Sequence, residues 1–175
     1  SLTTHNGNIT TANAITAKQN VTATTDKGNI ELQKAVTAQA GSITAETKDG
    51  NVTAADTLTA AQNVTAKTDK GNVELQKAVT AQAGSIEGIA LNGSVTADGS
   101  LSSGLDTHLK AVDAGTTDDP LLGNVTVNSS ITSGRNTKLE SVQGNISVAG
   151  SVAAQGTVEA GTTNGNIDFT ATDGT

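Results

Sequence analysis

Aliphatic residues recur along the chain every six or seven positions, with small polar residues between them. Around each of them the pattern alternates, as in "NIT", "AITA" and "NVTA", so the aliphatic side chain points inward and its Thr or Asn neighbours point outward. This alternation predicts short β-strands, three in each unit. The regularly spaced residues are Ile9, Ile15, Val21, Ile30, Val36, Ile43, Val52, Leu58, Val64, Val73, Val79, Ile86, Ile146, Val152 and Val158.

Glycine marks a longer period in the same pattern. A Gly followed by Asn or Ser, and then by Ile or Val, recurs at intervals of 21, 22, 21, 22, 30, 21 and 21 residues. Three short strands in each such unit predict an all-β fold, a parallel β-helix of about eight coils. With coils about 4.8 Å apart, the rod would be roughly 35–40 Å long. The expected coils begin at Gly7, Gly28, Gly50, Gly71, Gly93, Gly123, Gly144 and Gly165.

Two other β folds are alternatives to the β-helix. The "HNGN" and "TNGN" segments are compatible with type I′ hairpins. Hairpins, however, give near-identical units no reason to stack in register. An ordinary β-sandwich is the second alternative. The regular period favours a single β-helix segment over residues 1–175.

One unit is nine residues longer than the others. Residues 93–112 align position by position with residues 123–142, so the excess lies in "DAGTTDDPLL" at residues 113–122. An insertion confined to one corner suits a solenoid, because its corners face solvent. The segment also holds Pro120, the only proline, which a central strand would reject. We therefore predict a corner insertion at residues 113–122.

Residues 19–43 return almost unchanged as residues 62–86, which is two units later. Charged residues at equivalent positions of successive units alternate in sign or are separated by Thr. Because like charges on neighbouring strands repel, two units form the smallest block that stacks on itself. The alternating sets are Asp26, Lys48 and Asp69; Lys27, Asp49 and Lys70; Lys34, Asp56 and Lys77; and Glu31, Thr53 and Glu74.

The amino-acid composition argues against several kinds of partner and binding site. Phe169 is the only aromatic residue, so the core must be built from aliphatic residues and Ala. The net charge of −7 and the pI of about 4.6 argue against nucleic acid and anionic membranes as partners. No apolar run approaches the ~20 residues of a membrane helix, so no membrane insertion is expected. The absence of Cys excludes disulfides and thiolate metal sites, and it suits bacterial export.

The "GNI-T-A" units with outward Thr and Asn resemble the repeat regions of filamentous-haemagglutinin-like adhesins. These are two-partner-secretion exoproteins of Gram-negative bacteria, and the resemblance covers Gly7 to Thr170. Similar solenoid repeats also occur in autotransporter passengers and other surface fibres. The resemblance implies a right-handed parallel β-helix that is secreted and forms a long fibre at the bacterial cell surface. The absence of an "NPNL"-type secretion motif suggests an internal segment of such a fibre.

The sequence thus predicts a structural segment of a surface fibre or adhesin, acting as a rigid rod. Its expected partners are the chain itself, end to end or within a longer solenoid, and a host or neighbouring cell surface. Neither enzymatic activity nor a cofactor is expected. The carboxylates are spread out and interleaved with Lys, Arg135 is the only arginine, and His5 and His108 lie far apart in sequence. A polysaccharide-active enzyme is therefore a minor alternative.

Two binding functions are further alternatives. Asp113, Asp118 and Asp119 bring carboxylates into the inserted loop, where calcium or a carbohydrate could bind. Ice binding would need a regular Thr-x-Thr array on one face. Thr57 and Thr59 fit such an array, but Ala14 with Thr16 and Ala35 with Thr37 supply only half of it.

Eight Asn-x-Ser/Thr sequons are candidate glycosylation sites, and some adhesins of the family resembled carry glycans at such sites. An outward Asn, an inward aliphatic residue and an outward Thr also spell a sequon without any glycan. The eight asparagines are Asn8, Asn20, Asn51, Asn63, Asn92, Asn124, Asn128 and Asn145.

Overall fold

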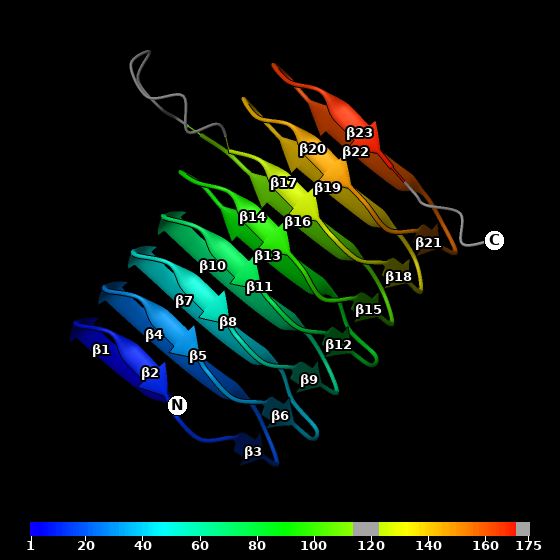
Figure 1. The fold of residues 1–175 in the computed structure, drawn as a ribbon. Coiled ribbons are helices and arrows are strands. Elements are labelled where there is room, and N and C mark those ends of the chain that lie inside the picture. Colours follow the sequence, from blue (N-terminus) through cyan, green and yellow to red (C-terminus); the bar gives the residue numbers. More distant parts are fainter. Residues whose placement is uncertain (114–122, 171–175) are drawn as a thin grey trace.

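The computed structural model describes residues 1–113 and 123–170 of the chain. These residues form 23 strands and no helix. The strands lie in three parallel sheets, and each turn of the chain visits all three, so the coils stack into a rod from the N-terminal to the C-terminal end (Figure 1). The predicted parallel β-helix, with about eight turns and three strands in each coil, is confirmed.

Sheet A contains the longest strands, of five to seven residues. In order along the rod these are β1 (Leu2–Asn6), β4 (Val21–Lys27), β7 (Ile43–Asp49), β10 (Val64–Lys70), β13 (Ile86–Ala90), β16 (Thr107–Ala111), β19 (Thr137–Ser141) and β22 (Val158–Thr162). One strand in each coil is therefore longer than the alternation around the regularly spaced aliphatic residues indicated.

Sheets B and C consist of three-residue strands. Sheet B contains β2 (Ile9–Thr11), β5 (Ile30–Leu32), β8 (Val52–Ala54), β11 (Val73–Leu75), β14 (Val95–Ala97), β17 (Val125–Val127), β20 (Ile146–Val148) and β23 (Ile167–Phe169). Sheet C contains β3 (Ile15–Ala17), β6 (Val36–Ala38), β9 (Leu58–Ala60), β12 (Val79–Ala81), β15 (Leu101–Ser103), β18 (Ile131–Ser133) and β21 (Val152–Ala154).

The register on either side of the long unit agrees with the alignment made from sequence. Leu109 of β16 pairs with Leu139 of β19, and Val95 of β14 pairs with Val125 of β17. The strands on both sides of the extra residues thus stack without any shift. Residues 114–122, which hold nearly all of the expected corner insertion, lie outside the described residues.

The predicted inward residues form a single aliphatic core. Ile30, Val73, Ile146 and most of their equivalents are fully buried, whereas the outward residues between them are not. Burial of this apolar surface is the main force that holds the coils together. The residues of the outermost coils are more exposed, as at Val158, because only one neighbouring coil covers them.

Between residues 32 and 101 the core alternates in side-chain volume from one coil to the next. At the third position of the sheet B strands a large residue alternates with a small one, and at the first position of the sheet C strands Leu alternates with Val. A bulky Leu of one coil is thus followed by the smaller residue of the next, which keeps the interior close-packed. The two columns are Leu32, Ala54, Leu75 and Ala97, and Val36, Leu58, Val79 and Leu101.

The glycines that mark the sequence period lie one above another at the corner between sheets A and B. A Cβ atom added to Gly28 would strike the carbonyl group of Gly7, and one added to Gly71 would strike that of Gly50. Both glycines also have a positive φ, of 130° and 132°, which other L-residues rarely adopt. Backbone conformation and the close approach of the coils therefore both require glycine at these two positions.

Buried threonines join the longest sheet A strands to this corner. The side chains of Thr25, Thr47 and Thr68 point inward, and each hydroxyl donates a hydrogen bond to the carbonyl of the glycine that begins its own coil, one turn earlier in the chain. The distance from Thr68 Oγ1 to the Gly50 oxygen is 2.7 Å. Each bond therefore ties the end of a sheet A strand to the corner one turn earlier in the chain.

Replacing Thr68 by Val is expected to lower the free energy of unfolding by about 1–2 kcal/mol. The change keeps the shape of the side chain but removes a buried donor, so the Gly50 carbonyl loses its partner. Thr65→Val on the outward face of the same strand is the matched control, with an expected change within about 0.5 kcal/mol. Urea unfolding followed by circular dichroism measures both, and equal effects would contradict a role for the hydroxyl.

Candidate functional site

Two columns of polar side chains follow the corners of the rod and bond each coil to the next. At the corner between sheets A and B, the side-chain oxygen of one coil accepts a hydrogen bond from the backbone N–H at the equivalent position of the following coil. The asparagines accept at distances of 2.8–2.9 Å, and Ser94 Oγ accepts at 3.1 Å. This corner column contains Asn8, Asn29, Asn51, Asn72, Ser94, Asn124, Asn145 and Asn166.

The corner between sheets C and A carries a second column of the same kind. Here Asn20 Oδ1 accepts from the Ser42 N–H at 2.9 Å, and Ser42 Oγ accepts from the Asn63 N–H at 3.2 Å. Both columns satisfy backbone donors at positions where the strands end, and unpaired donors there would be costly. The second column contains Asn20, Ser42, Asn63, Ser85, Asp106, Asn136 and Thr157.

The candidate glycosylation sites largely coincide with these columns. Six of the eight sequon asparagines are column members, namely Asn8, Asn20, Asn51, Asn63, Asn124 and Asn145. The other two use the side-chain nitrogen: Asn92 Nδ2 donates to the Asp69 carbonyl, and Asn128 Nδ2 donates to Asp98 Oδ1. Asn therefore recurs directly before the first aliphatic residue of the sheet A and sheet B strands because its side chain bonds one coil to the next. Glycosylation stays a prediction.

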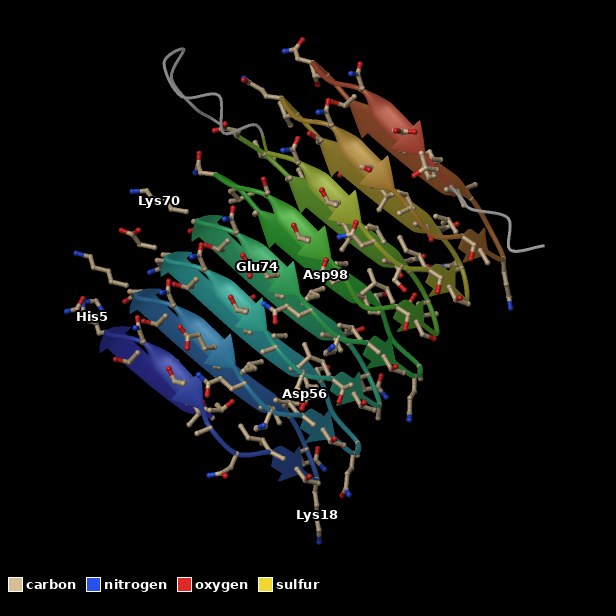
Figure 2. The ribbon with its side chains drawn as sticks, in the orientation of Figure 1. His5, Lys18, Asp56, Lys70, Glu74 and Asp98 are labelled. Atoms are coloured by element: carbon tan, nitrogen blue, oxygen red, sulfur yellow. The ribbon has the colours of Figure 1, made fainter. Side chains whose placement is uncertain are left out.

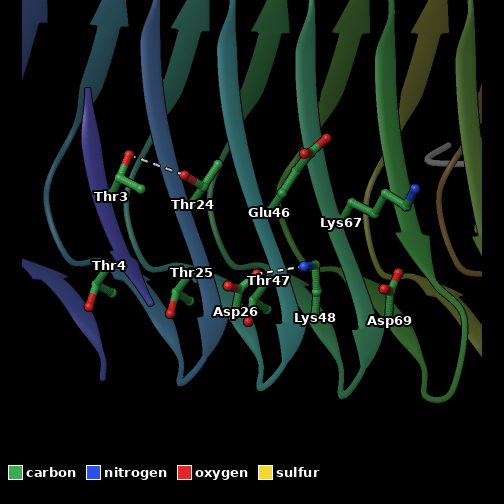
Figure 3. A pocket seen from close by; sticks show the side chains of 10 residues that line it. All are labelled: Thr3, Thr4, Thr24, Thr25, Asp26, Glu46, Thr47, Lys48, Lys67 and Asp69. Carbon is green, nitrogen blue, oxygen red and sulfur yellow. Dashed lines mark hydrogen bonds and ion pairs between the residues drawn. The ribbon is translucent and has the colours of Figure 1, made fainter. Parts of the chain in front are cut away.

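The outward face of sheet A carries the charge columns that the sequence indicated. Asp26 lies between His5 and Lys48 of the adjacent coils, and Lys48 Nζ is 2.7 Å from Asp26 Oδ1. The hydrogen bonds from Lys48 and then from His5 hold the pKa of Asp26 below its ordinary value. Asp26 and Lys48 line an open polar hollow together with Glu46, Lys67 and Asp69 (Figure 3).

The alternation of charge is confirmed by the register, but most opposite charges do not touch. Lys27 pairs with Asp49, and Asp49 pairs with Lys70. Glu46 is likewise opposite Lys67. Across residues 1–113 and 123–170, however, none of these pairs comes within 4.0 Å, and in these columns the contacts that do are those of Asp26 with Lys48 and with His5. The alternation mainly keeps like charges apart.

A second cluster of charges lies in the later coils, around Asp106. Its carboxylate accepts hydrogen bonds from the Arg135 guanidinium and from both the backbone and the side chain of Asn136. The bonds from Arg135 lower the pKa of Asp106 to about 2, and those from Asn136 act in the same direction. Asp106 therefore combines a place in the corner column with the only contact to a guanidinium among the described residues.

Acid is expected to weaken the contacts of Asp106 over a defined pH range. Because the pKa of Asp106 is lowered on folding, its contribution is present above its ordinary value of 3.8 and is lost as the pH falls towards 2. Arg135 is 58% exposed, so solvent screens the pair and we expect a loss of about 1 kcal/mol. Asp106→Asn keeps an acceptor for Asn136 but removes the titrating charge.

The measurement is urea unfolding of both proteins at pH 5, 3.5 and 2. The difference in free energy of unfolding between wild type and Asp106→Asn should shrink as the pH falls. A difference that does not change with pH would show that the charge of Asp106 contributes nothing.

His108 lies on sheet A close to this cluster. Its Nε2 atom is 2.7 Å from Glu140 Oε2, its Nδ1 atom is 4.0 Å from Glu87 Oε1, and Lys138 Nζ is 2.9 Å from Glu140 Oε1. Burial raises the pKa of Glu140, but the bonds from Lys138 and His108 outweigh it, and the net shift is downward. His5 is on β1 and His108 on β16, so the structure does not bring the two histidines together.

The predicted metal ligands are only partly described. Asp113 is half-buried, while Asp118 and Asp119 lie outside the described residues. Within residues 1–113 and 123–170, no group of three or more His, Asp or Glu side chains is arranged to hold a metal ion. The labelled charged side chains, among them Asp56 and Glu74, instead spread over the coils (Figure 2). Calcium or carbohydrate binding by the 113–122 loop stays a prediction.

Ice binding would need two neighbouring columns of Thr on the outward face of sheet C. Thr16, Thr37, Thr59 and Thr80 form one continuous column, extended by Ser102 and Thr132. The neighbouring column begins with Ala14 and Ala35 and has Thr57 as its next member. A regular double array is therefore not formed in this part of the sheet.

Comparison with protein-family models, with curated proteins and with solved structures gives no significant match to this chain. The resemblance to filamentous-haemagglutinin-like adhesins thus rests on the repeat units themselves. In the part of the chain that the structure describes, no helix has the length and hydrophobicity needed to cross a membrane.

Proposed function

We propose that this chain is a structural segment of a secreted bacterial surface fibre or adhesin. It would act as a rigid rod that holds an adhesive tip or a matrix contact away from the cell. Its partners would be other solenoid coils, in a longer chain or end to end, and the surface of a host or neighbouring cell. Two-partner secretion would bring it to the surface, as in the adhesins that its repeats resemble.

The observation that carries this proposal is the direction in which the polar side chains act. Asn51 and Asn63, like most members of the two corner columns, direct their side-chain oxygen to the coil that follows. Thr47 and Thr68, near the end of their coils, direct their hydroxyls to the glycine that begins the same coil, one turn earlier in the chain. Side chains used in this way resist separation of the coils along the rod. This resistance to separation favours a mechanical role.

A ligand-binding module is the second candidate. The observation in its favour is the position of the 113–122 segment in the chain, after β16, the sheet A strand that carries His108. Loops displayed on rigid scaffolds often carry binding functions. Deletion of residues 113–122 would distinguish the two: loss of adhesion with an intact rod favours the module.

Electron microscopy of native material with an antibody against this chain tests the fibre proposal. We expect thin surface filaments that carry label along their length, with a cross-β spacing near 4.8 Å in aligned material. Label on compact soluble particles would contradict the fibre. It would direct attention to calcium and polysaccharide binding by the 113–122 loop.

A further inference from the structure

Two kinds of coil alternate in the first half of the rod. We name residues 28–49 and 71–92 the X coils, and residues 7–27 and 50–70 the Y coils. The kinds differ in the sheet B strand and the corner after it. At three equivalent positions the X coils carry Glu31, Leu32 and Lys34 or Glu74, Leu75 and Lys77, and the Y coil at 50–70 carries Thr53, Ala54 and Asp56.

The register places these residues directly against one another. Thr53 lies between Glu31 and Glu74, and Ala54 lies between Leu32 and Leu75. In each of these coils, three residues form the corner between the sheet B strand and the sheet C strand. Asp56 therefore lies between Lys34 and Lys77. The Y coil at 50–70 thus presents a neutral side chain to the glutamates, a small one to the leucines and an opposite charge to the lysines.

Stacking one X coil directly on another would remove all three of these arrangements. Glu31 would lie one strand spacing, about 4.8 Å, from Glu74, and Lys34 would lie equally close to Lys77. Like charges placed directly opposite one another on neighbouring strands are destabilising. Leu32 and Leu75 would also meet without the Ala that now separates them, and overfilling a packed core is unfavourable.

We propose that the stacking face of each coil is a recognition surface whose partner is a coil of the other kind, within the chain or in a second copy of it. This surface rejects a shift of one coil and accepts a shift of two. It thereby fixes the register of a chain in which residues 19–43 and 62–86 are nearly the same. The inference concerns assembly of the solenoid and does not depend on the proposed fibre function.

Two deletions test the proposal. Removing residues 50–70 joins Asp49 to Gly71 and stacks X on X. Removing residues 28–70 joins Lys27 to Gly71, as Lys70 is joined in the native chain, and stacks Y on X. The second variant has lost one coil more, so length alone would make it the less stable. We expect the opposite, with a urea midpoint about 1 M lower for the 50–70 deletion. An equal or higher midpoint for that variant would overturn the proposal.

A set of three substitutions gives the second readout. Glu31→Thr, Leu32→Ala and Lys34→Asp together give coil 28–49 the Y pattern. In the 50–70 deletion they restore a Y-on-X contact and should raise the urea midpoint. In the full chain they stack Y on Y, with the carboxylate introduced by Lys34→Asp against that of Asp56, and should lower it. A change of the same sign in both proteins would show that coils do not discriminate between kinds. This comparison holds even if the unsubstituted deletion fails to fold.

Discussion

Replacing Gly71 by Ala is expected to lower the free energy of unfolding by about 3 kcal/mol or more. Two costs combine at this corner. The backbone φ of 132° is unfavourable for Ala. The new Cβ would also strike the carbonyl group of Gly50 and come within 2.7 Å of Asn51 Oδ1, so the two coils would have to move apart. Urea unfolding measures the loss.

Gly7→Ala is the matched control for this prediction. Gly7 has nearly the same φ, 131°, but the nearest atom to an added Cβ is Thr4 Oγ1 at 4.0 Å. The control should lose only the conformational part, about 1–2 kcal/mol. The difference between the two variants therefore measures the close approach of the coils. Equal losses would contradict that contribution and leave backbone conformation as the whole reason for glycine.

Replacing Leu75 by Ala is expected to cost about 2–5 kcal/mol of the free energy of unfolding. Leu75 is 1% exposed and lies between Ala54 and Ala97 in the core column, so its removal leaves a cavity that neither small neighbour can fill. Because neighbouring coils share this column, the loss should appear in the unfolding of the whole stack. Circular dichroism in urea measures it.

Leu105→Ala makes the same chemical change at a side chain that is 39% exposed. It should cost about 1 kcal/mol, because much of this side chain is already in contact with water. A Leu75→Ala variant no less stable than the Leu105→Ala variant would contradict the packed core that alternating volumes create.

The fold could be predicted from sequence because its signal is local and repeated. Residues such as Ile30, Val36 and Ile43 are spaced by the length of one strand and one corner, and the glycine period sets the length of a coil. The alignment across the long unit also followed, since the Leu109–Leu139 pairing needs only the count of residues after each corner.

The bonds between coils could not be predicted in the same way, because their partners are one whole coil apart. Thr68 resembles any other threonine of the chain until its acceptor, the Gly50 carbonyl, is placed beside it. The asparagine columns are visible in the sequence as an Asn or Ser that recurs directly before an aliphatic residue. The same pattern, however, also spells a sequon. Arg135 and Asp106 are 29 residues apart, on opposite sides of the inserted segment, so nothing local links them.

Because each coil stacks on the one before it, adding coils should lengthen the rod without widening it. A second copy of residues 28–70 inserted after Lys70 repeats a junction that the native chain already has between Lys27 and Gly28. Small-angle X-ray scattering should show a maximum dimension about 10 Å greater, two strand spacings, with an unchanged cross-sectional radius. A larger cross-section with no gain in length would contradict the stacked solenoid.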